Sequence, residues 1–372
     1  YISAGAVMTD TFLVFGTTLS LVSVWFVLSG RSDYWRWWFF MGLAIGLLSK
    51  GPLAVVLTVI PLVLWAAIFR QRLQPLKKLP WLLGSLLTLA IAVPWYVLAE
   101  LKTPGFLNYF IIGEHFSRFL DPGWAGDLYG SAHDRPKGMI WIFWLWASFP
   151  WGIIGLVGFG LAAARGKTKD IFTGAVQDAS TLYLLFCAIT PMLFFTLAGN
   201  TLWTYILPSL PFSAILIAGW VSKLDLGAWS RVRSGAVLLV PVLITLVVFI
   251  SVSGVIPLKT EKQLISRYES IHQAGDSPIF YIGEMPFSAR FYSLGDAVEI
   301  ISTEFNSLLE ADGYARVFAV IPNHAVDEVL GPRATDAQKL GENERYQLFS
   351  IDLPPTDSQN DPVDSELNSK ND

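Results

Sequence analysis

The chain has 372 residues, of which 53% are hydrophobic and only 15% charged, with 15 Trp, 25 Phe and a mean hydropathy of +0.49. A soluble globular domain carries about 25% charged residues, so this composition excludes a wholly soluble protein and predicts membrane-embedded helices. The single Cys187 excludes a disulfide framework, and no basic cluster is large enough to predict nucleic acid as a partner.

Charge divides the chain into two regions. Residues 1–256 hold 17 Lys+Arg against 10 Asp+Glu, whereas residues 257–372 hold 9 against 20. The apolar residues are concentrated in the first region. The sequence therefore predicts a membrane domain over residues 1–256 and a separate acidic, soluble part after it.

Eight segments of the first region are apolar and nearly long enough to cross a membrane, since a spanning helix needs about 20 mostly apolar residues. They are residues 6–28, 34–49, 53–69, 79–99, 139–163, 182–197, 202–221 and 236–255. The second and third form one apolar run, interrupted at Lys50-Gly51-Pro52. Because Gly-Pro ends a helix, this run predicts two short spans that turn at Lys50.

Basic residues in the loops predict the orientation of these spans. Alternate loops (30–36, 70–80, 164–180 and 222–233) carry twelve Lys+Arg, and the loops of the opposite side carry five. Basic loops stay on the cytoplasmic side of a membrane. Asp10, Lys50, the loop 101–137 and the region from residue 257 are therefore expected on the outer side.

The acidic region predicts a small soluble α/β domain over residues 257–352. Four apolar runs have the length of strands, and helical stretches lie between them: 279–282, 298–301, 317–321 and 348–351. This alternation is typical of βαβ units and predicts a largely parallel sheet. No Gly-rich phosphate loop follows a strand. Residues 353–372 are acidic without aromatic residues, which predicts a disordered tail.

Asp10 and Lys50 are the first candidates for a functional site. An ionisable residue at the end of a span is a functional candidate because its burial costs at least about 2.5 kcal/mol. Asp10 could equally be an interfacial residue that caps a helix. Lys50 lies against the positive-inside bias, and its ammonium beside a Gly-Pro turn suits a phosphate oxygen. The alternative is a snorkelling lysine at a helix end.

The loop 101–137 holds a further set of candidates. Residues 106–120 (FLNYFIIGEHFSRFL) predict an amphipathic helix that lies in the headgroup plane and contacts membrane lipids. Glu114 and Arg118 are four residues apart, so they could form an ordinary helix ion pair, or Arg118 could bind an anionic group with Glu114 orienting it. His115 could be a metal ligand, but a second ligand at suitable spacing is missing. A divalent metal cofactor therefore stays open.

Several short motifs occur together in a fixed order. They are MTD (8–10), LLSKGP (47–52), VPWY (93–96), PGF (104–106), EHFSRF (114–119), HDRP (133–136), FPW (149–151) and TYILP (204–208). This ordered set resembles the polytopic lipid-linked-sugar glycosyltransferases of bacteria, which include the aminoarabinose (lipid A) transferases and relatives of the protein O-mannosyltransferases. The resemblance covers residues 1 to about 220 and, more loosely, the soluble region.

The resemblance implies a GT-C type fold in the bacterial inner membrane, with chemistry on the periplasmic side. The donor would be a polyprenyl-phosphate sugar, and the acceptor lipid A, another glycan or a protein. By resemblance, Lys50 and Arg118 hold the donor phosphate, while Tyr205, Glu114 and His115 line the donor site. Asp10 belongs to the catalytic cavity.

Two departures from the family pattern limit what the resemblance implies. The family's catalytic aspartate lies in a first periplasmic loop upstream of residue 1, and residue 1 is Tyr, so the chain is expected to be an N-terminally truncated form without the catalytic base. The family often has Lys-Leu-Pro before Thr-Tyr, where this chain has Asn200-Thr201-Leu202-Trp203, so that part of the donor site is not predicted by the resemblance. The competing interpretation is a polytopic transporter or flippase of lipid-linked substrates, although no inverted repeat supports it.

Overall fold

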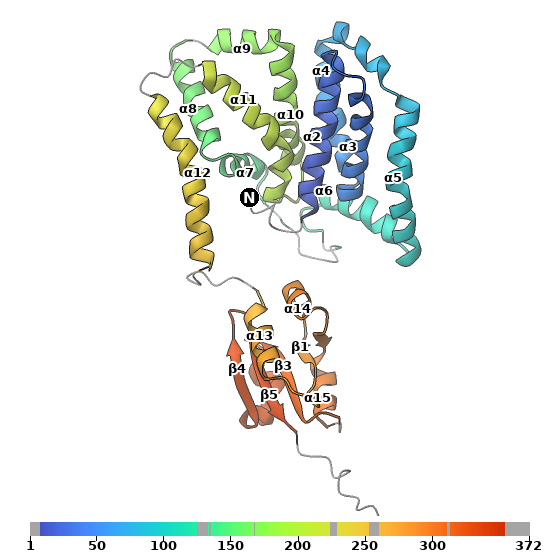
Figure 1. Cartoon of the computed structure of the whole chain (residues 1–372), viewed down its shortest axis with the longest axis vertical. Coiled ribbons are helices and arrows are strands. Elements are labelled where there is room, and N and C mark those ends of the chain that lie inside the picture. Colours follow the sequence, from blue (N-terminus) through green and yellow to red (C-terminus); the bar gives the residue numbers. More distant parts are fainter. Residues whose placement is uncertain are drawn as a thin grey trace, which may run out of the picture. The chain divides into compact units, whose positions relative to one another are not determined.

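The computed structural model describes residues 8–124, 126, 133, 135–166, 168–223, 229–252, 260–310 and 313–353. It forms two compact units, one up to Val240 and one from Pro241 onwards (Figure 1). The first unit is helical and the second contains a five-stranded sheet. The proposed tail beyond residue 353 and the segment 253–259 lie outside the described residues.

The helical unit begins with four helices. These are α2 (Thr9–Leu28), α3 (Trp35–Lys50), α4 (Leu53–Ile68) and α5 (Trp81–Lys102), with the short 3-10 helices η1 (Arg70–Arg72) and η2 (Gln74–Lys78) between the last two. Small residues bring α2 and α3 together: a Cβ added to Gly16 would lie 2.6 Å from the Gly42 carbonyl oxygen. Ser20 Oγ also donates to the Phe39 carbonyl at 2.9 Å. Close packing of this kind is how helices associate in a membrane, where the lipid offers no hydrophobic drive.

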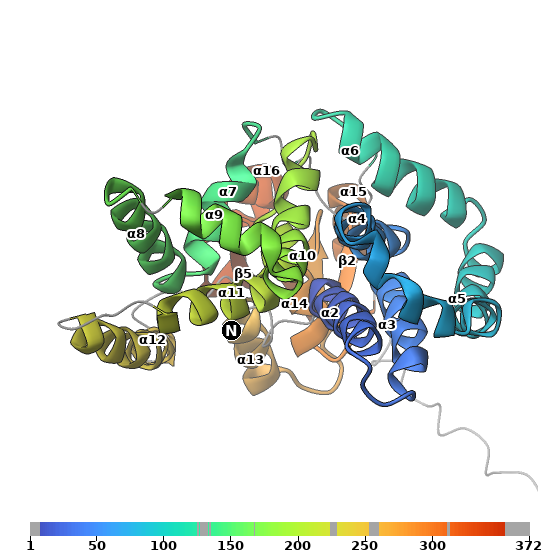
Figure 2. The ribbon, with the colours of Figure 1, turned by 90° about the horizontal axis from the view of Figure 1, so that it is seen from above.

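The helical unit continues after α5 with a further series of helices. Its elements are η3 (Asn108–Ser117), α6 (Arg118–Leu120), α7 (Met139–Ala147), α8 (Trp151–Ala164), α9 (Thr168–Gln177), α10 (Ala179–Thr196), η4 (Trp203–Ser209), α11 (Leu210–Lys223) and the first part of α12 (Trp229–Val252), whose residues from Pro241 onwards belong to the second unit. Figure 2 shows α10 beside α4 and α11, in the middle of the helical unit. α5 lies at one edge of this unit and α8 at the other.

Among the described residues, four helices are long and apolar enough to cross a membrane, or six if each of two bent pairs is counted as one span. The multi-span membrane fold is therefore confirmed, while the number of eight stays a prediction. The predicted turn at Lys50 is present, since α3 ends at Lys50 and α4 begins at Leu53. The predicted span over 139–163 is bent: α7 and α8 are separated by a break at which the direction of the helix changes by 107°. Pro150 lies at this bend and has no N–H to continue the helix.

The predicted amphipathic helix over 106–120 is helical, but mostly as a π-helix. Figure 1 shows this segment, which ends in α6, steeply inclined to α2, α3 and α5. π-Helical turns are frequent at functional sites because they re-aim side chains.

The sheet unit has the strand order β2-β1-β3-β5-β4. Its elements are α13 (Lys262–Ile271), β1 (Ile279–Ile282), α14 (Phe287–Tyr292), β2 (Val298–Ile300), α15 (Ser302–Glu310), β3 (Arg316–Pro322), α16 (Val326–Leu330), η5 (Gly331–Thr335), β4 (Ala337–Glu342) and β5 (Tyr346–Asp352). Side chains of β1 and β3 are buried on both faces of the sheet, which is why these strands appear in the sequence as continuous apolar runs.

The predicted α/β class is confirmed, but the sheet is mixed. β2, β1 and β3 are parallel, whereas β5 runs antiparallel to both β3 and β4. The prediction of a largely parallel sheet was wrong at the β5–β4 edge. Only three residues separate β4 from β5, and so short a connection can join two neighbouring strands only if they are antiparallel. The edge strand β4 was missed because its sequence, AQKLGE, is polar and half exposed.

Candidate functional site

Three of the predicted site residues meet at one end of the helical unit. Asp10 lies in the first turn of α2 and is 7% exposed. Its Oδ2 lies 3.4 Å from Nζ of Lys50, the last residue of α3. The same ammonium lies 5.8 Å from the ring centroid of Tyr205 in η4. Elements that are distant in sequence thus place a carboxylate, a cation and an aromatic ring together.

The contacts of Asp10 bear on its two interpretations. Among the described residues, the N-cap of α2 is Met8, which makes no side-chain cap hydrogen bond. Asp10 lies inside the first turn rather than at the N-cap, and its contact with Lys50 explains how a carboxylate is tolerated at the end of a span.

The turn after Lys50 is shaped to approach another segment closely. Gly51 has φ 59°, in the left-handed region that favours glycine. A Cβ at this position would lie 2.8 Å from Phe110 Cε1 and 3.2 Å from the His115 ring. Glycine therefore lets the turn that carries Lys50 pack against η3.

His115 joins this turn to η3 directly. Its Nε2 lies 2.8 Å from the carbonyl oxygen of Lys50, and its Nδ1 lies 2.6 Å from the carbonyl oxygen of Phe110. Both ring nitrogens are thus engaged by backbone oxygens, which leaves neither available as a metal ligand. Across the described part of the chain, no group of three His, Cys, Asp or Glu side chains is arranged to hold a metal ion.

Glu114 and Arg118 form the helix ion pair that their spacing predicted. Arg118 Nη1 donates to Glu114 Oε2 at 2.8 Å, and the Tyr109 hydroxyl donates to Oε1 of the same carboxylate at 2.8 Å. Glu114 therefore fixes the orientation of a guanidinium that is largely buried. A guanidinium has five N–H donors, so this pairing is compatible with Arg118 also binding an anion.

Asn200 is a site residue that the sequence interpretation missed. Its Nδ2 donates to the carbonyl oxygens of Arg118 and Asp121, both at 2.7 Å, and its Oδ1 accepts from the N–H of His133 at 2.9 Å. The side chain is buried. A side-chain amide offers two N–H donors and an acceptor oxygen at once, so Asn200 holds the segment before η4 to the segment that carries Arg118.

Tyr205 is held in place by the core of the helical unit. Its ring stacks on Phe195 at a centroid distance of 4.5 Å, within a cluster that includes Leu13, Ala54 and Ile206. The ring beneath the Lys50 ammonium is therefore a rigid wall of the site.

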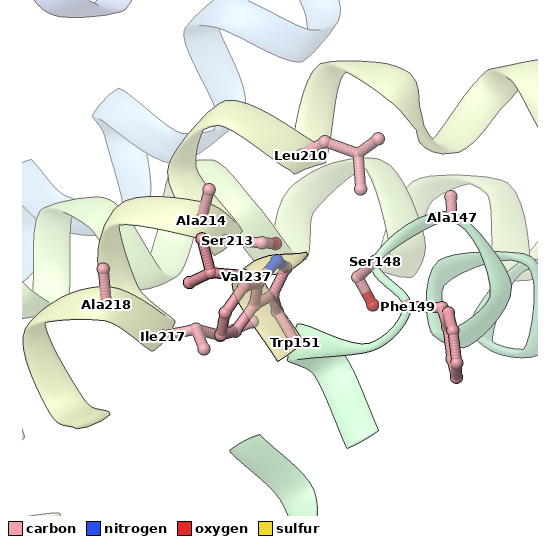
Figure 3. A pocket seen from close by; sticks show the side chains of 10 residues that line it. All are labelled: Ala147, Ser148, Phe149, Trp151, Leu210, Ser213, Ala214, Ile217, Ala218 and Val237. Atoms are coloured by element: carbon pink, nitrogen blue, oxygen red, sulfur yellow. The ribbon is translucent and has the colours of Figure 1, made fainter. Parts of the chain in front are cut away.

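An apolar cavity of about 460 Å³ lies apart from these residues, between the α7–α8 bend, α11 and α12 (Figure 3). Ser148 and Ser213 are its polar side chains, and Ser213 accepts a hydrogen bond from Trp144 Nε1 at 3.0 Å. Among the described residues that line this cavity, none is ionisable.

Comparison with known proteins relates the sequence to membrane glycosyltransferases. The profile of the dolichyl-phosphate-mannose-protein mannosyltransferase family matches residues 1–110. An undecaprenyl phosphate-alpha-4-amino-4-deoxy-L-arabinose arabinosyl transferase of Pseudomonas fluorescens (strain Pf0-1) is 30% identical over 243 residues, which are 62% of this chain and 37% of that protein. The corresponding transferase of Pseudomonas aeruginosa (strain UCBPP-PA14) is 30% identical over 241 residues, 62% of this chain and 39% of that protein. The matched part therefore spans well under half the length of these relatives.

Solved structures extend the comparison to nearly the whole chain. The crystal structure of ArnT from Cupriavidus metallidurans bound to undecaprenyl phosphate aligns with a TM-score of 0.68, covering 94% of this chain and 76% of that one at 16% identity. Its apo form aligns with a TM-score of 0.63. At this identity the alignment demonstrates a shared fold. The resemblance that the motifs predicted is thereby confirmed: in sequence and in fold, this chain is similar to the GT-C glycosyltransferases that use lipid-linked sugars.

Proposed function

We propose that this chain carries the donor-phosphate site of a membrane glycosyltransferase that moves a sugar from a polyprenyl-phosphate donor to an acceptor on the periplasmic side of the bacterial inner membrane. The observation that supports this most is the bridge through His115, which ties the turn of Lys50 to the segment of Arg118. Two cations from distant parts of the sequence thus belong to one assembly, beside the ring of Tyr205.

Lys50 and Arg118 bind the phosphate and stabilise it as the bond to the sugar breaks. Negative charge builds up on the departing polyprenyl phosphate, and fixed cations in a site of low dielectric lower the barrier most where charge develops. Glycosyl transfer also needs a base for the acceptor hydroxyl. Asp10 is paired with Lys50, so we assign it a supporting role, in which it positions the ammonium.

The test is transfer from a labelled polyprenyl-phosphate sugar in native membranes, with variants Lys50→Ala and Arg118→Ala. Each removes a charge-assisted contact worth about 1.5–3 kcal/mol, so donor affinity should fall about tenfold or more. Lys102→Ala is the matched control, because this exposed lysine lies at the end of α5 and should leave affinity unchanged. Unchanged donor affinity in both site variants would refute the phosphate role.

The acceptor is open between lipid A, another glycan and a protein. The same assay with each acceptor class offered separately distinguishes them, because the donor site is common to all three. A transporter or flippase would instead move the donor across the bilayer without cleaving the sugar. Movement of intact donor in the absence of sugar release would replace the transferase by that alternative.

The periplasmic placement is tested by topology. Reporter fusions after Lys78 and after Leu353 should report cytoplasm and periplasm respectively, because the loop 70–80 is basic and the sheet unit is acidic. Both fusions reporting the same compartment would contradict the orientation.

A further inference from the structure

The imidazole of His115 faces two groups of the same hydrogen-bonding kind. Nδ1 lies 2.6 Å from the Phe110 carbonyl oxygen and Nε2 lies 2.8 Å from the Lys50 carbonyl oxygen. A carbonyl oxygen only accepts hydrogen bonds, while a neutral imidazole has one N–H and one acceptor nitrogen. Only the imidazolium, which donates from both nitrogens, satisfies this geometry.

The position of the ring also favours a positive charge. Lys50 is the last residue of α3, so its carbonyl belongs to the helix end that carries the negative side of the macrodipole. The Tyr96 hydroxyl donates to another carbonyl of the same end, that of Leu47, at 2.5 Å. Two side chains from other elements therefore satisfy the terminal carbonyls of α3, and His115 can do so as a cation.

The charge of the site depends on whether His115 is protonated. Asp10 neutralises Lys50, and Glu114 neutralises Arg118. Among the described residues, these two ion pairs sum to no net charge, so an imidazolium at His115 would add a positive excess to them. An anionic phosphate is attracted by that excess, and a departing phosphate that gains charge is attracted more strongly.

We propose that His115 is a positioning residue that acts as an imidazolium, fixing Lys50 relative to Arg118 and making retention of an anionic phosphate depend on pH. This rests on the proposed function. His115 does not itself contact the reacting atoms: it holds the backbone of Lys50 and adds its charge nearby. When the ring loses a proton, one of the two bonds is lost and the turn of Lys50 is released from η3 or η3 is locally loosened.

Charged groups on the neighbouring elements are paired with one another. Lys50 on α3 pairs with Asp10 on α2, and Arg118 on α6 pairs with Glu114 on η3. On α5, Tyr96 contributes a hydroxyl, and its ring packs against Phe110, whose own ring meets the imidazole edge-on.

The decisive experiment compares binding of a polyprenyl-phosphate sugar to the wild type and to His115→Gln in nanodiscs between pH 5.5 and 8.5. Glutamine can donate to one carbonyl but carries no charge. At the acidic end the wild type should bind about tenfold more tightly than the variant, because the imidazolium adds a positive charge near the anionic phosphate and holds the turn of Lys50. As pH rises through the range in which imidazoles titrate, the wild type should approach the affinity of the variant. Parallel pH profiles for the two proteins would overturn the proposal.

A second measurement separates this proposal from the proposed function. Thermal unfolding without any donor should show the wild type more stable than His115→Gln at pH 5.5 and equal to it at pH 8.5. His324→Gln, at an exposed position of the sheet unit, should leave this comparison unchanged. If neither protein binds the donor but the stability difference depends on pH as expected, the proposed function fails and the role of His115 stands. If the stability difference is the same at both pH values, the imidazolium is refuted.

Discussion

Each unit of the molecule buries a carboxylate beside a cation, but the two pairs are built differently. In the sheet unit, Glu261 is completely buried, with Oε1 accepting from Arg345 Nη2 and Oε2 from Asn343 Nδ2, both at 2.8 Å. Burial, with this carboxylate nearby, also raises the pKa of Tyr281, so the phenol stays neutral. In the helical unit, Asp10 meets Lys50 at 3.4 Å, and the lysine side chain keeps 27% of its surface exposed.

The difference separates a structural ion pair from one that can open. Both oxygens of Glu261 have close partners, so the carboxylate fastens the start of α13 to the β4–β5 turn. The Asp10–Lys50 contact is longer and partly solvated, and such pairs contribute little to stability. A phosphate can therefore compete with Asp10 for the ammonium at low cost. We expect substitutions in the first pair to affect folding and in the second to affect ligand binding.

The largest effect on stability is expected for Glu261→Ala. It leaves Arg345 and Asn343 without their partner in a buried site, which should cost about 2–3 kcal/mol, less than for a fully buried pair because Arg345 is partly exposed. Thermal unfolding of the full chain measures the loss. Glu342→Ala, which removes an exposed partner of Lys339, should cost at most about 1 kcal/mol. Equal losses of unfolding free energy in the two variants would show that the contacts of Glu261 do not stabilise the sheet unit more than an exposed ion pair does.

Gly51→Ala should come next, at about 2 kcal/mol, since it adds a Cβ to a left-handed residue and presses it against Phe110 and His115. Gly105→Ala is the matched control: Gly105 has φ 90°, but nothing lies within 4 Å of an added Cβ. The excess loss in Gly51→Ala measures the close approach alone, and donor affinity should fall only in this variant. Equal stability and equal donor affinity in the two variants would show that the contact between the Lys50 turn and η3 does not matter for either property.

Asn200→Asp should have a smaller effect, about 1–2 kcal/mol, because an aspartate keeps the acceptor for His133 but turns an oxygen toward the carbonyls of Arg118 and Asp121. Asn323→Asp is the comparison, since Asn323 Nδ2 also donates to two carbonyls but is exposed to solvent. Thermal unfolding should detect the first substitution and barely the second. A stable Asn200→Asp variant with normal donor affinity would show that the position of Arg118 does not depend on Asn200.

How much the sequence could predict depended on the range of the interactions. The turn at Lys50 and the Glu114–Arg118 pair follow from local rules, a Gly-Pro break and a spacing of four residues, and both are present. The convergence of Asp10, Lys50 and Tyr205 came from the resemblance, since no local pattern joins residues so far apart. The partners of His115 and Asn200 include backbone carbonyls of distant segments. Every residue has a backbone carbonyl, so the sequence does not indicate which of them will be a partner. The same holds for β4, whose polar residues gain a place in the sheet only by pairing with β5.

The smallest effect on stability is expected for Asp10→Asn, at less than about 1 kcal/mol, because the pair is long and Lys50 can turn toward solvent. The amide keeps the size of the carboxylate and removes only its charge.

The same substitution also affects donor binding. With Lys50 no longer neutralised, an anionic donor should bind as tightly as in the wild type or a few-fold more tightly, since two unit charges at about 4 Å interact appreciably near a protein surface. Donor affinity and turnover must be measured separately, because the two possible roles of Asp10 differ in this respect. If Asp10 serves only as the partner of Lys50, donor affinity stays equal or rises a few-fold and turnover falls only modestly. Abolished turnover with unchanged affinity would instead identify Asp10 as the group that accepts the proton of the acceptor hydroxyl, and the pair with Lys50 would then serve to keep it ionised.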